Sequence, residues 1–142
     1  MQDNFEQWFG SANGFYRQHL HALDENELNI AAFELHQSAE RFYTAVLLTY
    51  TDYRPKEHNL RELNSKAHAQ DSRFAEAFPK ETQEQKDRFE LLVRAYIDAR
   101  YRMKQYHITR EDLEYLGQRV LVLKELTEKL CSERIGKVWT QI

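Results

Sequence analysis

The chain has 142 residues, of which 42% are hydrophobic and 30% charged, a profile typical of a globular protein that can bury a sizeable core. Only four Gly and two Pro argue against a turn-rich β-sandwich and favour long helices joined by few loops. The net charge of -3 gives the molecule no general attraction for nucleic acid, so any polyanion must be bound by a local basic patch.

Several classes of protein are excluded at this point. The single Cys131 rules out an intramolecular disulfide and a cysteine-based zinc cluster. The N-terminal segment is acidic and aromatic, unlike a secretory signal, and no apolar stretch approaches the length that spans a bilayer. We therefore expect one cytoplasmic domain over residues 1–142, with no membrane partner and no cofactor. A flexible tail is expected from about residue 136 to 142.

Apolar residues that recur every three or four positions predict two long helices in the first half, over residues 4–23 and 27–51. Pro55 stops the second helix, because proline disfavours α geometry in the residue before it. The inward stripe of the first helix consists of Phe5, Trp8, Phe9, Ala12, Phe15, Tyr16, Leu20 and Leu23. The stripe of the second consists of Ile30, Phe33, Tyr43, Val46, Leu47 and Tyr50.

The second half begins with a shorter helix over residues 58–69 and a loop over residues 71–80. A capping-box spacing at Thr82 starts the next helix, whose apolar stripe runs to Ile97, and Thr109 opens the last helix in the same way. We expect Gly136 to end that helix. The predicted fold is all-α, an antiparallel up-and-down helical bundle of four main helices plus a short helix. The last helix also carries a second apolar edge, which favours a homodimer: Leu121, Val122 and Leu126. We expect the dimer interface to include either this helix or the helix over residues 27–51.

A polar cluster interrupts the apolar second helix at His36, Gln37, Ser38 and Glu40. Because buried polar groups need partners, these residues either line a cleft or form a hydrogen-bond network between helices. His58, at the start of the short helix, either caps that helix or meets an anion drawn by its free N–H groups. The histidines lack the spacing of a helical zinc site, so no metal is expected.

The segment from Arg100 to His107 is the most informative part of the chain. Arginine offers a fixed fork of donors to phosphate, and histidine can move a proton near neutral pH. Arg100 or Arg102, together with His107, could therefore bind and cleave a phosphodiester. The alternative is that these cations complement the helix macrodipole and cap its last carbonyls.

Three segments, in this order, resemble the HEPN family: residues 31–40 (AAFELHQSAE), 55–60 (PKEHNL) and 94–101 (RAYIDARY). More narrowly, the chain is similar to the C-terminal HEPN half of bacterial proteins that fuse a minimal nucleotidyltransferase to a HEPN domain. The resemblance covers nearly the whole chain and implies a dimerising helical bundle with a cleft near the dimer axis. Since the nucleotidyltransferase half is missing, we expect either a separated domain or a stand-alone partner.

The resemblance implies a HEPN-type nucleotide/RNA-binding and dimerisation module that acts with a minimal nucleotidyltransferase, fused or separate. The alternative that it implies is a metal-independent, toxin-like ribonuclease with an Arg-x4-6-His motif, in which Arg100, Arg102 and His107 are catalytic. The residues expected to bind nucleotide are His36, Gln37, Lys56, His58, Tyr96, Arg100 and Tyr101. We expect Arg100, Tyr101, Arg102 and His107 to face one cleft, joined by His36 or Gln37.

Overall fold

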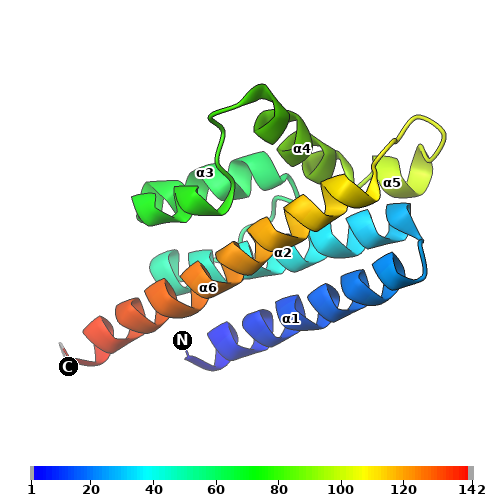
Figure 1. The fold of residues 1–142 in the computed structure, drawn as a ribbon. Helices are drawn as coiled ribbons and strands as arrows, with labels where there is room; N and C mark the ends of the chain where they lie inside the picture. The colour runs from blue at the N-terminus through cyan, green and yellow to red at the C-terminus, as the bar shows by residue number, and fades with distance from the viewer. Residues whose placement is uncertain (1, 141–142) are drawn as a thin grey trace.

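The computed structural model describes the backbone of residues 2–140 and the side chains of residues 4–136, and this part of the chain is helical with no strand. The predicted all-α bundle is confirmed (Figure 1). In chain order its elements are α1 (Gln2–Asp24), α2 (Leu28–Thr51), α3 (Leu60–Gln70), the 3-10 helix η1 (Ser72–Ala77), α4 (Gln83–Arg94), the short α5 (Asp98–Tyr101) and α6 (Arg110–Thr140).

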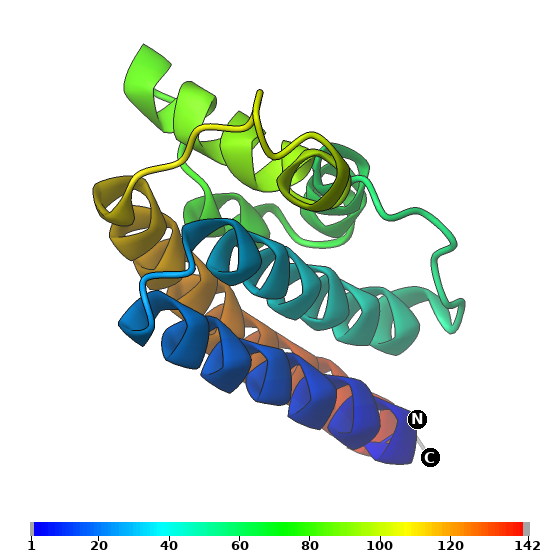
Figure 2. The same ribbon diagram turned by 90° about the vertical axis from the view of Figure 1, so that its right-hand side faces the viewer.

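The central element is α2, which contacts each of the five other α-helices. It runs antiparallel to α1, while α6 crosses the bundle and α3 and α4 cover the remaining side (Figures 1 and 2). Because α2 is surrounded, its side chains are buried over most of the stretch from Ala31 to Thr49. Its polar residues are therefore held inside the bundle, where each must find a hydrogen-bond partner.

Both predicted capping boxes are present. Thr82 accepts a hydrogen bond from the backbone N–H of Gln85, whose side chain in turn accepts from the backbone N–H of Thr82. The same exchange joins Thr109 and Asp112 at the start of α6. These reciprocal bonds satisfy N–H groups that a helix start leaves free, which explains why the starts of α4 and α6 were predictable.

Three predicted boundaries were wrong. The cap of α3 is Asn59, whose side chain accepts from the backbone N–H of Arg61 at 2.8 Å; His58 therefore precedes the cap. The stripe through Ile97 is not one helix, because α4 ends at Arg94 and a tight turn precedes α5. Gly136 does not end α6, which continues to Thr140, while residues 141–142 of the predicted tail lie outside the described residues.

Three apolar residues predicted to face inward are about half exposed: Leu20 at 48%, Ile30 at 50% and Ile97 at 50%. Leu20 and Ile30 flank the turn between α1 and α2, and Ile97 lies in the turn before α5. These three side chains stay exposed because no other described element packs over the helix ends and the turn where they lie. Separately, no helix within the described residues is both long enough and apolar enough to cross a membrane.

Candidate functional site

A hollow of about 420 Å³ opens between the start of α1, the middle of α2 and the connection formed by residues 52–59. That connection leaves the end of α2 and returns along the side of the bundle to α3 (Figure 2). We call this the basic hollow, because three cations and one carboxylate lie among the residues that line it: Trp8, Gln37, Glu40, Arg41, Thr44, Arg54, Pro55, Lys56 and His58.

The cations of the basic hollow outnumber its one carboxylate and have no ion-pair partner among the described residues. No described carboxylate forms an ion pair with Arg41, Arg54 or Lys56, whereas cations elsewhere, such as Arg61 with Glu90, are paired. The guanidinium groups of Arg54 and Arg41 lie over the ring of Trp8, 4.7 and 5.4 Å from its centre. Cations that keep free donors in a partly enclosed site attract phosphate.

The one carboxylate that lines this hollow, Glu40, accepts hydrogen bonds from neighbouring side chains at both of its oxygens. Glu40, only 8% exposed, accepts a hydrogen bond from Nδ1 of His58 through Oε1. Its other oxygen, Oε2, accepts from Nε2 of Gln37 at 3.1 Å. Because both oxygens have donors from neighbouring side chains, Glu40 is held on the α2 wall of the hollow and orients His58, and its single negative charge offsets one of the three cations.

His36 lies beneath His58 and is fully buried. Burial lowers the pKa of His36 to about 3, so its imidazole is neutral. Its Nε2 donates to the backbone carbonyl of His58 at 3.1 Å, and its Nδ1 accepts from Nε2 of Gln37 at 3.3 Å. His36 therefore supports the backbone of the connection and has no nitrogen left for a ligand.

Tyr96 joins this cluster to the arginine motif. Its ring stacks on that of His58, with centres 4.8 Å apart and planes inclined by 6°. Its backbone carbonyl accepts from Nε and Nη2 of Arg100, at 2.9 and 2.6 Å. The guanidinium of Arg100 also lies over the rings of Phe33, Tyr96 and Tyr101. The guanidinium of Arg100 thus donates to the backbone carbonyl of Tyr96, which accepts no hydrogen bond from a described backbone N–H group because the helix is interrupted there.

The structure brings six of the predicted site residues into one connected cluster and leaves three at or beyond its edge. The cluster contains His36, Gln37, Lys56, His58, Tyr96 and Arg100. Tyr101 is 73% exposed at its edge. Arg102 is exposed, 3.9 Å from Asp98. His107 is exposed as well, and no hydrogen bond or ion pair joins it to a described residue of the cluster.

A tight turn separates Arg102 from His107. The carbonyl of Arg102 accepts from the backbone N–H groups of Gln105 and Tyr106, both at 3.0 Å. The hydroxyl of Tyr106, which is buried, donates to the carbonyl of Leu91 at 2.6 Å and so fixes the connection to α4. Arg102 and His107 therefore stand on either side of an anchored turn, with their side chains in solvent.

A family model described as the HEPN domain matches residues 5–130. The chain belongs to the HEPN domain family. The matched range runs from α1 through most of α6 and includes both the basic hollow and the Arg100–His107 segment. HEPN domains have nucleotide- and RNA-related functions and are often dimeric. A comparison with curated proteins found no match.

Sequence reasoning missed three charged or aromatic residues of the basic hollow of this HEPN domain: Trp8, Arg41 and Arg54. Spacing could have revealed Arg41, because it follows Gln37 by four residues, which places the two on one helical face. No local pattern links Trp8 or Arg54 to the site, since only the packing of α1 and the connection against α2 brings them there.

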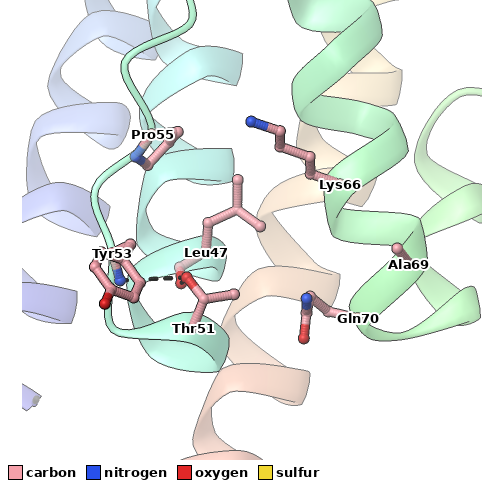
Figure 3. Close-up of a pocket in the computed structure, with 7 residues that line it drawn as sticks. All are labelled: Leu47, Thr51, Tyr53, Pro55, Lys66, Ala69 and Gln70. Carbon is pink, nitrogen blue, oxygen red and sulfur yellow. Dashed lines mark hydrogen bonds between the residues drawn. The ribbon is translucent and has the colours of Figure 1, made fainter.

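A second hollow of the HEPN domain, of about 280 Å³, lies on the other side of the same connection (Figure 3). Its lining residues are Leu47, Thr51, Tyr53, Pro55, Lys66, Ala69 and Gln70. The one cation, Lys66, is paired with Glu57, so this hollow offers no free charge to phosphate. Among the described residues, no group of three His, Cys, Asp or Glu side chains is arranged to hold a metal ion.

Proposed function

We propose that this chain is a HEPN-type module that binds the phosphate groups of a nucleotide or RNA in the basic hollow. The observation that carries the proposal is the presence around one hollow of about 420 Å³ of three cations, Arg41, Arg54 and Lys56, that form no ion pair with a described carboxylate. The hollow lies beside His36, Gln37 and His58, three of the seven residues that the resemblance assigns to nucleotide binding. A phosphate there replaces water around cations that form no ion pair with a described carboxylate.

The test is binding of a labelled single-stranded RNA oligonucleotide, measured by fluorescence polarisation over a range of salt. If all three cations contact phosphate, the logarithm of the binding constant falls against the logarithm of salt concentration with a slope of about -2. The double variant Arg54→Gln/Lys56→Gln should bind more weakly and with a shallower slope. The control, Lys86→Gln/Lys129→Gln, makes the same change in net charge at exposed sites outside the hollow. Equal loss in both variants would refute a specific phosphate site.

The module is further proposed to act as a homodimer with a minimal nucleotidyltransferase, fused or separate. The support for this partner is the resemblance of residues 31–40, 55–60 and 94–101 to the HEPN half of such fusions. The support for the dimer is the half-buried edge of α6 at Leu121 and Val122. A dimer would place two basic hollows in one assembly.

The second candidate function is metal-independent cleavage of RNA by Arg102 and His107. One observation favours it: both side chains project into solvent beside an anchored turn, and among the described residues the one ion-pair contact of either side chain is that of Arg102 to Asp98, at 3.9 Å. The arginine would hold the phosphate and the histidine would transfer the proton. Incubation of the pure chain with total RNA and EDTA tests this. Cleavage that disappears in His107→Ala supports the nuclease, and an absence of cleavage excludes it.

A further inference from the structure

A third hollow, of about 520 Å³, lies between α3, the end of η1 and the segment that leads on to α4. It is separate from the basic hollow, because the two share no lining residue. Its wall combines the apolar side chains of Ala75, Phe78 and Pro79 with five polar residues, of which Lys80 supplies the one amine. The question is what this amine can do there.

Two uncharged partners hold Lys80 against one wall of the hollow. Its Nζ donates to Oδ1 of Asn64 at 3.2 Å and lies 4.6 Å from the centre of the Phe89 ring. No carboxylate of the described residues forms an ion pair with it, whereas Lys66 is paired with Glu57. The amine therefore has a defined place in the hollow without a carboxylate bonded to it.

The acceptor that positions this amine is anchored in the core. Asn64 is only 8% exposed, and its Nδ2 donates to the hydroxyl of the fully buried Tyr43 at 2.8 Å. Because the nitrogen of the amide is turned toward Tyr43, its oxygen is turned toward Lys80. The place of the amine thus follows from the packing of α2 against α3 and not from a loose surface contact.

An amine is a nucleophile only in its neutral form, and the surroundings of Lys80 favour that form. Partial burial lowers the pKa of Lys80, although the negative charge of Glu90 acts in the opposite direction. A neutral amine keeps an N–H for Asn64 and gains a lone pair for reaction. The side chain of Lys80 is also open to solvent, so a reagent can reach it.

The rest of the wall limits what kind of reagent fits. The apolar side chains of Ala75, Phe78 and Pro79 can cover the hydrocarbon part of an acyl group. The carboxylates of Glu76 and Glu81 border the same hollow, so a donor with a phosphate next to its acyl group is disfavoured by like charge. A thioester carries no charge at its reacting end and meets both conditions.

We propose that Lys80 is a modification site, whose amine takes an acyl group from a thioester that enters this hollow. The nitrogen attacks the carbonyl carbon, a C–N bond forms, the C–S bond breaks, and the sulfur leaves as a thiolate that takes up the proton lost by the nitrogen. The product is an amide, which keeps an N–H for Asn64 but offers no charge to the ring of Phe89. Modification therefore removes a positive charge from this surface and leaves its anchor on α3 in place.

The experiment is competitive labelling of the whole chain with a limiting amount of S-acetyl-N-acetylcysteamine, an uncharged thioester, followed by peptide mass spectrometry. Lys80 should be acetylated several-fold faster than Lys86 and Lys129, which are exposed and lie outside the hollow. In the chain unfolded by urea the three rates should converge, because the advantage of Lys80 comes from the fold. Equal rates in the folded chain would overturn the inference.

Two variants change the charge around the amine in opposite directions. Asn64→Asp places a carboxylate next to Nζ and can still accept from the hydroxyl of Tyr43, so it should slow the labelling of Lys80. Glu90→Gln removes the negative charge that favours the ammonium form and should speed it. Glu25→Gln, the same charge change in the turn between α1 and α2, should leave the rate unchanged. A Lys80 rate that neither of the two variants alters would also overturn the inference.

Discussion

Tyr96 stacks its ring on His58 while its backbone carbonyl accepts two hydrogen bonds from Arg100. This single residue links the basic hollow to the arginine of the sequence motif. The carbonyl is available because α4 ends at Arg94, so the backbone N–H of Arg100 bonds to Ile97 instead. Arg100 is therefore in a position to stabilise the turn that holds Tyr96 against His58.

We predict that Arg100→Ala weakens phosphate binding in the basic hollow without removing a phosphate contact. Losing its hydrogen bonds and its contacts with the rings should loosen Tyr96 and reduce affinity by about threefold. Proton resonances of the His58 ring, which the stacked Tyr96 ring shifts, should move toward their values in a free imidazole. Arg102→Ala, two residues away and exposed, serves as the control. Unchanged His58 resonances in Arg100→Ala would contradict this role.

The stability of the fold should depend on pH through His36. The pKa of its imidazole is lowered to about 3 by burial, whereas in the unfolded chain it is about 6.5. Between these values the unfolded state binds a proton that the folded state excludes, so the free energy of unfolding falls as the pH drops below about 6.5, by up to ~1.4 kcal/mol per pH unit. His19, whose pKa burial also lowers, adds to the same trend.

Urea unfolding at pH values from about 7.5 to about 5.0 measures this dependence, because this range spans the pKa of about 6.5 of a histidine in the unfolded chain. In His36→Gln the slope of stability against pH should be shallower than in the wild type, whatever the variant's absolute stability. His21→Gln, at an exposed position near the end of α1, should leave the slope unchanged. Identical slopes in the wild type and His36→Gln would mean that His36 does not remain neutral in the folded chain.

The fold was largely predictable because its signals are local. Apolar periodicity located the helices, and the capping residues Thr82 and Thr109 marked two of their starts to within a residue. The break after Arg94 was not predictable, since it accompanies the stacking of Tyr96 on His58, 38 residues earlier in the chain, a contact that no local pattern reveals. The prediction that Gly136 ends the last helix was wrong, because a single glycine lowers the stability of a helix but does not by itself end it.

The candidate site was predictable only in part, for the same reason. His36, Gln37 and His58 stood out as polar residues in or beside apolar helices, and the structure joins them in one network. Trp8 and Arg54 have no such signal, because an aromatic residue on the apolar stripe of a helix usually packs in the core and cationic side chains are common on loops. Their place in the basic hollow follows from the packing of α1 and the connection on α2, which is a property of the whole fold.

The buried pair Tyr43 and Asn64 should stabilise the contact between α2 and α3. Tyr43 is fully buried, and its hydroxyl accepts from Nδ2 of Asn64 at 2.8 Å. Tyr43→Phe leaves that N–H without a partner, so the free energy of unfolding should fall by about 1–2 kcal/mol. Chemical denaturation measures the loss. Tyr53→Phe, at a side chain of 79% exposure, should have almost no effect, and equal losses in the two variants would rule out this explanation.

The homodimer is expected to form through the outer edge of α6. Leu121, Val122 and Leu126 are all half-buried in the single chain, but only Leu126 packs against the core. The edge at Leu121 and Val122 is therefore apolar surface that a partner subunit can cover. Light scattering at tens of micromolar, about the range in which weak dimers persist, should show a dimer.

Leu121→Gln/Val122→Gln should convert this dimer to a monomer while retaining the helical content, because neither side chain belongs to the core cluster. Leu20→Gln, which changes an apolar residue of 48% exposure near the end of α1, should remain dimeric. If the wild type is monomeric in light scattering at about tens of micromolar, the prediction of a homodimer is wrong. A dimer that survives the α6 change but is lost in Ile30→Gln, at a position of 50% exposure, would move the interface to α2, the other helix expected to form it.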